Sequence, residues 1–223
     1  MKAKWSAIVP FRGTAGSKSR LIVPGSARPS ENALRLASAF AADLIEALAA
    51  ARRVGSVLIV SARGGAGFAS DGFDCEWILD SGKNLNTAAE AGIAAARAHH
   101  PDRGAVVLPA DLPLVRGSDI DEMLDTADDH SSAYVSDRGG TGTSALTLRP
   151  DFQGRPRFGA DSAAAHRRNG FAPLPVDPAH PVRWDIDTYD DLVAARPFGF
   201  GPRTEEVLEN LLRETAIAPA SGP

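Results

Sequence analysis

The sequence has little cysteine, little lysine and no long apolar run. Cys75 is the only cysteine among 223 residues, so no disulfide can form within the chain and a reducing compartment is expected. Lysine occurs only at Lys2, Lys4, Lys18 and Lys83. The first apolar run spans about six residues, too few for the core of a signal peptide, and no later run reaches the ~18 residues of a membrane span. These absences predict a cytoplasmic protein without a membrane partner.

The overall charge excludes a further class. The chain has a net charge of −4 and an isoelectric point near 5.7, whereas a general nucleic-acid-binding domain is normally basic. Apolar residues make up 43% and charged residues 23%, which is typical of a globular protein. We therefore expect no nucleic-acid partner and one domain over residues 1–215, with a flexible C-terminal tail over 216–223.

Apolar runs alternate with helical patterns along the first ~130 residues. This alternation predicts an α/β fold with a mixed, mostly parallel central sheet flanked by helices. Two runs near 133–148, separated by a glycine-rich turn, predict an antiparallel pair near one edge. The expected strands are 5–10, 56–61, 76–79, 105–108, 133–136, 144–148 and 183–186. The expected helices are 30–52, 86–99, 118–128, 161–168, 189–196 and 204–215, with Ser30, Ser118 and Thr188 as candidate N-caps.

The first strand runs into a basic loop, WSAIVPFRGTAGSKSRL, over residues 5–21. Its glycines, Gly13 and Gly16, fit neither the Walker A spacing nor the three-glycine Rossmann fingerprint. Lys18 and Arg20 are two residues apart, so in an extended segment they point to one face and could hold a triphosphate. The alternative is a solvated basic loop. A second glycine cluster, at 62–68, is interpreted as a mobile turn.

Three aspartates follow or lie within apolar runs. Asp111 comes just past a buried strand, between two prolines, where α/β sheets bind ligands. Asp185 and Asp187, in WDIDT, would lie on one face of a strand, where a cation would offset their repulsion. Together the three predict a Mg²⁺ site, because Mg²⁺ prefers carboxylate and phosphate oxygens. The alternatives are a turn aspartate at 111 and a helix cap at 187.

Two further segments suggest a second anion site. DRGGTGTS, at 137–144, is rich in glycine and threonine, and RFGADS, at 157–162, ends at an expected helix start. Backbone N–H groups at such places bind anions, although two ordinary tight turns would give the same pattern. His166, in the helix that follows, is interpreted as a helix-surface residue rather than a catalyst.

The ordered set of motifs resembles one family. The set comprises the basic loop closing on SKSRL, LNTA at 85–88, PADLPL, DRGGTGTS, RFGADSAAAHRR and WDIDTYDDL. Together they resemble the phosphoenolpyruvate/2-phospho-L-lactate guanylyltransferases (CofC/FbiD type) of coenzyme F-420 biosynthesis, over about residues 5–202. The resemblance implies a single-domain nucleotidyltransferase fold, Rossmann-like and related to the molybdenum-cofactor guanylyltransferases (MobA) and the GT-A sugar-nucleotide transferases.

The resemblance also implies a reaction and site residues. GTP and a three-carbon phospho acid would give a guanosine diphospho acid and pyrophosphate with Mg²⁺ as cofactor, and a partner enzyme of the pathway could take over the unstable product. By motif, Asp111, Asp185 and Lys18 would be catalytic, and Asp111, Asp185 and Asp187 would lie at the metal. Thr143, Gly159 and Ser162 would hold the acid, and Pro10, Arg12, Lys18, Arg20 and Asn86 the nucleotide.

Three other functions stay open at the level of sequence. The protein could be a nucleotidyltransferase for a molybdopterin or a sugar phosphate. It could instead be a non-catalytic nucleotide-binding module or a purely structural α/β protein. The three aspartates disfavour the last two, because a simple binder has less need of paired metal ligands.

Overall fold

A computed structural model of the chain describes residues 5–11, 20–21, 24, 26, 28–62, 75–80 and 84–217. The strands are β1 (Trp5–Pro10), β2 (Val54–Ser61), β3 (Cys75–Leu79), β4 (Gly104–Val107), β5 (Ser132–Ser136), β6 (Thr143–Leu148) and β7 (Ala172–Pro173). The α-helices are α1 (Pro29–Ala50), α2 (Leu85–His99), α3 (Gly117–Ala127), α4 (Ser162–Arg168), α5 (Tyr189–Ala195) and α6 (Pro202–Ile217). Two 3₁₀ turns, Pro181–Arg183 and Arg196–Phe198, complete these elements.

The strands form one seven-stranded sheet in the order β3-β2-β1-β4-β6-β5-β7. β1 pairs in parallel with both β2 and β4, β2 with β3, and β5 with β7. β6 runs antiparallel to both β4 and β5. The predicted mixed, mostly parallel sheet is therefore confirmed, as is the antiparallel pair at 133–148, and one short strand, β7, was missed.

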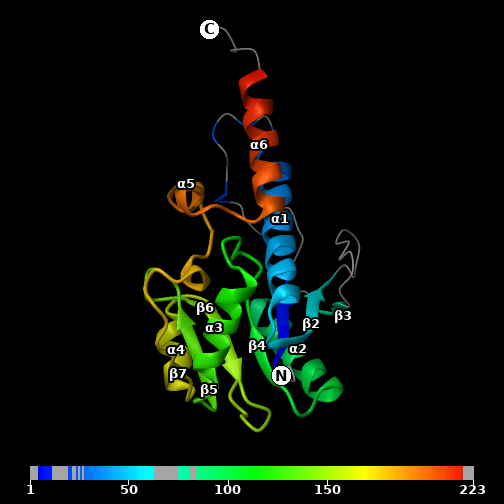
Figure 1. Ribbon diagram of the computed structural model, residues 1–223, viewed down its shortest axis with the longest axis vertical. Coiled ribbons are helices and arrows are strands. Elements are labelled where there is room, and N and C mark those ends of the chain that lie inside the picture. Colours follow the sequence, from blue (N-terminus) through cyan, green and yellow to red (C-terminus); the bar gives the residue numbers. More distant parts are fainter. Residues whose placement is uncertain are drawn as a thin grey trace.

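Helices cover both faces of the sheet (Figure 1). Along β1, Trp5, Ala7 and Val9 belong to the core cluster that includes residues of α1 and α3, while Ile8 belongs to the cluster of α2. This alternation follows from the pleat of a strand, which turns successive side chains to opposite faces. Because both faces are buried, the strand needs a continuous apolar run rather than an alternating one.

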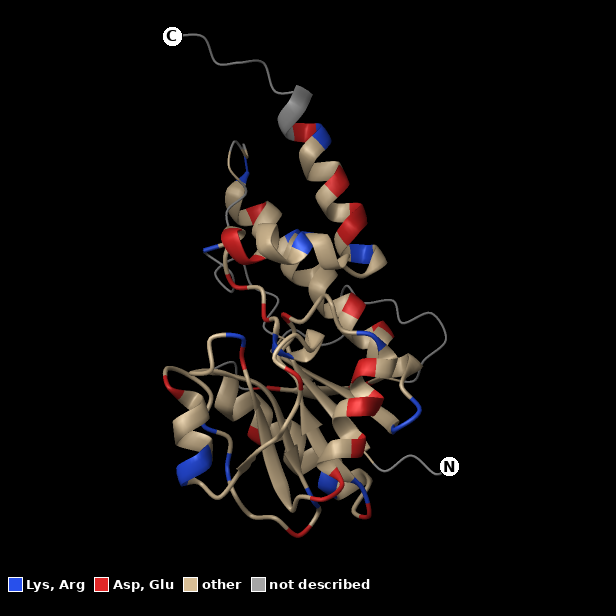
Figure 2. Ribbon diagram, turned by 60° about the vertical axis from the view of Figure 1, so that its left-hand side comes forward, with Lys and Arg blue, Asp and Glu red and all other residues tan. Residues whose placement is uncertain are grey.

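A third cluster lies beyond the edge of the sheet. Figures 1 and 2 show the first half of α1 and α6 extending together past the strands. Leu36 and Phe40 of α1 share a buried cluster with Leu208 and Leu211 of α6. Ile186 and Leu192, from α5 and the segment before it, belong to the same cluster, which consequently anchors the WDIDT segment.

Some predicted local structure was wrong. Residues 183–186 are not a strand, because a 3₁₀ turn over Pro181–Arg183 leads into an irregular stretch. Ser30 and Ser118 lie inside the first turns of their helices, which begin one residue earlier, at Pro29 and Gly117. A proline at the first helical position sets φ for the helix and lacks an N–H that would go unpaired there.

The remaining predicted helices are present, and Thr188 caps α5 as expected, its hydroxyl accepting from the backbone N–H of Asp191 at 3.1 Å. α6 runs two residues past the predicted end of the domain at 215, and residues 218–223 of the predicted tail lie outside the described part. None of the helices in the described part of the chain is both long and apolar enough to cross a membrane.

Candidate active site

The site begins at the carboxyl ends of β1 and β4. These strands are parallel neighbours, with Ile8 opposite Val107, and the backbone N–H of Leu108 donates to the carbonyl of Ile8 at 3.0 Å. The chain beyond Pro10 and the chain carrying Asp111 therefore leave the sheet at one edge. β2 lies on the other side of β1, so this edge is a switch point at which α/β folds place ligands.

The WDIDT segment reaches the same edge through one backbone bond. The N–H of Ile186 donates to the carbonyl oxygen of Asp111 at 2.9 Å. The Ile186 side chain is fully buried in the third cluster, and the carboxylates of Asp185 and Asp187 flank it. Asp111 lies more than 70 positions before Asp185 in the sequence, and this bond places the segments that carry them side by side, although the WDIDT segment is not a strand.

The pKa of Asp185 reflects both its burial and the neighbouring carboxylates. Burial and, after it, the negative charges of Asp111, Asp187 and Asp137 together raise the pKa of Asp185 to about 7. A carboxyl with such a pKa is partly protonated at neutral pH unless a cation is present. Perturbed groups of this kind cluster at functional sites.

The end of the basic loop also lies at this edge. Arg20 approaches Asp187, with Nη2 and Oδ2 3.7 Å apart, and both side chains are substantially exposed. Leu21 is fully buried in the cluster that holds Ile186 and so anchors the loop end beside the acidic segment. Of the other predicted nucleotide-binding residues, Pro10 is the buried last residue of β1, and Arg12 and Lys18 lie outside the described residues.

The donor set fits a magnesium ion. Asp111 and Asp185 supply two carboxylates beside each other, and Mg²⁺ is held by one or two carboxylates together with phosphate oxygens and water. Burial and the neighbouring carboxylates make the ionised form of Asp185 unfavourable, which raises its pKa, and a bound cation would offset this. Within the described residues, no three His, Cys, Asp or Glu side chains form a complete metal-ligand group, so substrate phosphates would have to complete the coordination.

Thr143, Gly159 and Ser162 lie around the start of α4. The N–H of Ser162 donates to the carbonyl of Gly159 at 3.2 Å, and the N–H of Ala163 donates to the carbonyl of Thr141 at 3.0 Å. These bonds bring the glycine-rich turn and the RFGADS segment together. They also occupy two amides at the helix start, and Ser162 is buried, so the hydroxyl of the partly exposed Thr143 is the more accessible anion donor. Gly159 has φ of +134°, a conformation that favours glycine.

Asn86, which was predicted to bind the nucleotide, forms hydrogen bonds with the backbone of Phe158. Its Nδ2 donates to the carbonyl of Phe158 at 2.9 Å, and its Oδ1 accepts from the N–H of Phe158 at 2.7 Å. Both ends of the amide are thus engaged by one backbone unit next to Gly159. This supports a role in orienting the RFGADS segment.

His166 is buried, so its interpretation as a helix-surface residue was wrong. Its ring is fully inaccessible to solvent and contacts the hydroxyl of Thr143. The reason is that α4 packs its inner face on β5 and on the RFGADS segment. The signal in the sequence was the spacing of Ser162 and His166, which lie four residues apart and so on one helical face.

Sequence reasoning also missed the residues that join the turn at 137–144 to the acidic segment. The carboxylate of Asp137 accepts from the N–H groups of Thr141 at 3.1 Å and Gly142 at 3.0 Å. Arg183 donates to the carbonyls of Asp137 at 3.0 Å and Ser136 at 3.2 Å. Arg138 lies 4.4 Å from the centre of the Trp184 ring. The DRGGTGTS motif contains Asp137 and Arg138, but it assigned them no role, because the partners in these contacts are mainly backbone atoms.

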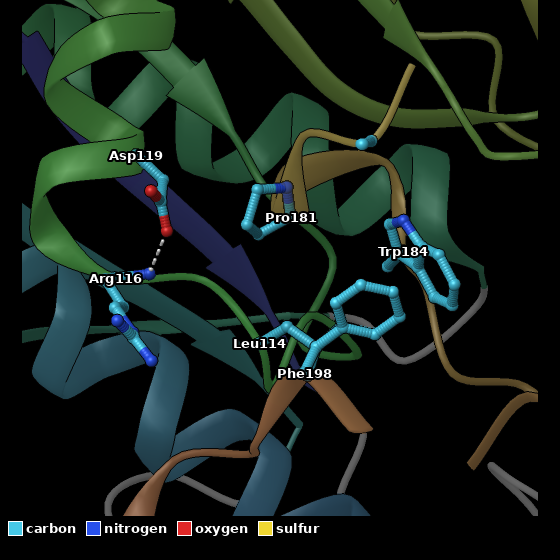
Figure 3. Close-up of a pocket in the computed structure, with 7 residues that line it drawn as sticks. Leu114, Arg116, Asp119, Pro181, Trp184 and Phe198 are labelled. Carbon is cyan, nitrogen blue, oxygen red and sulfur yellow. Dashed lines mark hydrogen bonds between the residues drawn. The ribbon is translucent and has the colours of Figure 1, made fainter. Parts of the chain in front are cut away.

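A pocket of about 220 Å³ opens beside Trp184, on the α3 side (Figure 3). Arg116 and Asp119 line it from the start of α3, with the N–H of Arg116 donating to the Asp119 carboxylate at 2.8 Å. The rings of Trp184 and Phe198, which also line it, pack against each other with centroids 4.8 Å apart. Pro181 and Leu114 complete the labelled walls. Among the described residues, no predicted site residue lines this pocket, although Trp184 is the direct neighbour of Asp185 in the chain.

Solved structures place this fold among the nucleotidyltransferases. A protein named as a nucleotide-diphospho-sugar transferase from Desulfovibrio desulfuricans G20 matches with a TM-score of 0.67 at 19% identity, covering 96% of this chain and 99% of that one. A nucleotidyl transferase from Methanothermobacter matches with a TM-score of 0.58 at 14% identity, covering 94% of this chain and all of that one. These likenesses show a single-domain α/β fold that proteins named as nucleotidyltransferases also have.

Sequence relatives identify the family. Residues 5–214 match the family described as "Guanylyl transferase CofC like", and the chain belongs to this family. The phosphoenolpyruvate guanylyltransferase of Streptomyces coelicolor is 36% identical over 212 residues, covering 94% of this chain and 98% of the relative. Phosphoenolpyruvate guanylyltransferase 2 of Rhodococcus jostii is 36% identical over 206 residues, covering 92% and 90%. The predicted family and enzyme class are therefore confirmed.

Proposed function

We propose that this enzyme transfers the guanylyl group of GTP to phosphoenolpyruvate, or to the closely related 2-phospho-L-lactate, in coenzyme F-420 biosynthesis. The relatives named above act on phosphoenolpyruvate, and they span nearly the whole chain. The observation that carries the proposal is the Ile186–Asp111 backbone bond, which sets Asp111 and Asp185 side by side at the switch point.

The proposed reaction is one displacement at phosphorus. A phosphate oxygen of the acid attacks the α-phosphorus of GTP, and a new P–O–P bond forms as the bond to the β-phosphate oxygen breaks. Pyrophosphate carries away the electron pair. No covalent enzyme intermediate is needed, so the chain's own residues have to align two anions and offset the charge that builds up between them.

Asp111 and Asp185 would hold Mg²⁺, with Asp187 nearby, and the bound cation would supply charge stabilisation at the transferring phosphate. Arg20, together with Lys18 and Arg12 from the same loop, would bind the triphosphate. The positive charge of Arg20 would meet the polyphosphate at the edge of the sheet where Arg20 now lies beside Asp187.

The second substrate would lie between the end of the glycine-rich turn, at Thr143, and the start of α4, at Gly159 and Ser162. This turn is linked to the acidic segment through Arg183 and Asp137. Asn86 fixes the backbone beside Gly159, so the turn is organised before the substrate arrives. A preformed anion site of this kind lowers the cost of ordering the two substrates.

The test is pyrophosphate release from each nucleoside triphosphate with each candidate acid, with masses of the products. We expect release with GTP and phosphoenolpyruvate or phospholactate, and turnover with only a sugar phosphate or a molybdopterin would overturn the proposal. In parallel, Asp111→Asn should abolish release while the circular dichroism spectrum and melting profile stay those of a folded protein. Asp151→Asn, at an exposed position, is the matched control and should keep normal turnover.

A further inference from the structure

His166 joins Thr143 to the RFGADS segment through both nitrogens of its ring. Nδ1 lies 2.9 Å from the hydroxyl oxygen of Thr143, and Nε2 lies 2.8 Å from the backbone nitrogen of Arg157. The ring is fully buried, whereas Thr143, the first residue of β6, is partly exposed. The buried imidazole thus connects the backbone of Arg157 to the hydroxyl of Thr143, which lies on the side proposed for the substrate.

The direction of these two hydrogen bonds follows from their chemistry. A backbone N–H can only donate, so Nε2 of His166 accepts from Arg157 and carries no proton. In a neutral imidazole the single proton is then on Nδ1, which must donate to Thr143. The ring is neutral at pH 7, because burial lowers the pKa of His166 to about 4, with a backbone hydrogen bond to Ser162 opposing this and the charge of Arg157 adding to it.

Other side chains hold the ring in this orientation. The rings of Phe158 and Phe171 lie edge-on to the imidazole, with centroids at 5.2 and 5.3 Å. The ring of Tyr134 stacks on it at 6.2 Å and an interplanar angle of 30°. The charged groups on neighbouring positions of its own helix, Arg167 and Arg168, are exposed. The imidazole is therefore enclosed by aromatic rings and by the groups that it bonds, which are Thr143, Arg157 and the backbone of Ser162.

The consequence concerns the Thr143 hydroxyl. Its oxygen accepts the proton of Nδ1, which leaves its own hydrogen available for an acceptor on the open side. We propose that His166 is a positioning residue that makes the Thr143 hydroxyl a hydrogen-bond donor toward the anionic group of the phospho acid. This inference rests on the proposed function, because it assigns the acid to the turn that contains Thr143. Without His166 the hydroxyl could rotate and present a lone pair to the anion instead.

Two substitutions separate this role from a purely structural one. Asparagine can place a donor near the position of Nδ1, so His166→Asn can still donate to Thr143 but no longer accepts from Arg157. Glutamine can place an acceptor near the position of Nε2, so His166→Gln keeps the bond to Arg157 but loses the donor. If His166 only held the loop at Arg157, the glutamine variant would be the better enzyme.

We expect the opposite order. His166→Gln should raise the KM for the acid about ten- to a hundredfold, the worth of one hydrogen bond to a charged group, with the KM for GTP little changed. His166→Asn should raise it clearly less. In a Thr143→Val background the glutamine substitution should add no further loss in KM, because the hydroxyl that it misaligns is gone. Melting curves of all variants check that the comparison is between folded proteins.

A measurement without substrate tests the same inference. Nitrogen-15 NMR of histidine-labelled protein, with the His166 signals assigned by their loss in His166→Gln, reports which ring nitrogen carries the proton. We expect protonation at Nδ1 at pH 7. A proton on Nε2, or a glutamine variant that binds the acid better than the asparagine variant, overturns the inference. Failure of the wild-type protein to release pyrophosphate would overturn the proposed function instead, while the NMR result would still decide the state of His166.

Discussion

Replacing Asp185 with asparagine should stabilise the metal-free protein at alkaline pH. The wild-type carboxyl is partly buried and close to Asp111, Asp187 and Asp137, which together with burial raise its pKa from 3.8 to about 7. The folded state therefore keeps a proton that the unfolded state has released between about pH 4 and pH 7. Over this interval the stability of the wild-type protein falls as pH rises, and above pH 7 the full cost is present.

The size of the effect follows from the shift in pKa. At about 1.4 kcal/mol for each pH unit, a rise from 3.8 to about 7 corresponds to about 4 kcal/mol. Solvent reaches part of the side chain, and screening reduces the measured value, so we expect about 2 kcal/mol. Asparagine has nearly the same shape and no charge, so it removes this cost and adds little of its own.

The assay is chemical denaturation of both proteins in EDTA at pH 5 and at pH 8. The difference in free energy of unfolding between Asp185→Asn and wild type should be less than half of its full size at pH 5, because this pH is only about one unit above the pKa of the unfolded carboxyl. It should reach about 2 kcal/mol in favour of the variant at pH 8. Other titrating groups cancel in this difference. Asp190→Asn, at an exposed position five residues away, is the matched control and should show no such change with pH.

A difference of the same size at both pH values would refute the reasoning, since it would show that Asp185 does not titrate in this interval. Adding Mg²⁺ at pH 8 gives a second comparison. The wild-type protein should gain thermal stability with the ion, whereas Asp185→Asn should gain little and should lose pyrophosphate release. An equal gain in thermal stability in both proteins would show that Asp185 does not bind the metal.

Three further substitutions test the site and the core. Gly159→Ala should destabilise the protein by about 1–2 kcal/mol, because φ is +134°, and should raise the KM for the acid; unchanged kinetics would remove Gly159 from the acid site. Asn86→Ala breaks two hydrogen bonds to Phe158 and should cost about 1–3 kcal/mol by denaturant titration; a neutral result would deny its orienting role. Gly92→Ala would place Cβ 2.3 Å from Cγ2 of Ile8 and should lower stability by about 1–3 kcal/mol with KM values unchanged; an unaltered melting temperature would contradict this packing.

Most of the fold could be predicted because its local and global signals agree. The strands of a sheet buried on both faces are continuous apolar runs, and such runs are visible without any tertiary information. The failure at 183–186 shows the limit of this signal. Trp184 and Ile186 alternate with two aspartates as in a strand, yet within the described part of the chain the backbone of Ile186 bonds only to that of Asp111. One such bond, together with burial of Ile186, fixes the segment without a ladder.

The site was partly predictable for a similar reason. Asp111 directly follows an apolar run. A residue just past the end of a buried strand lies at the edge of the sheet where α/β folds bind ligands, and this holds for any arrangement of the other elements. Asn86 and His166 depend instead on contacts with residues 72 and 23 positions away. Their partners are a backbone unit and a hydroxyl, which leave no pattern in the sequence, so side-chain chemistry alone could not assign their roles.

The separation between the acidic segment and the turn proposed for the acid is also set by hydrogen bonds to backbone atoms. Arg183 lies two residues before Asp185, and its guanidinium donates to the carbonyls of Ser136 and Asp137. The carboxylate of Asp137 in turn holds the amides of the glycine-rich turn. One side chain therefore joins the acidic segment to the turn proposed for the acid. The proposed in-line displacement requires both phosphates at a fixed separation, and a link made of hydrogen bonds to backbone atoms would provide that separation before either substrate binds.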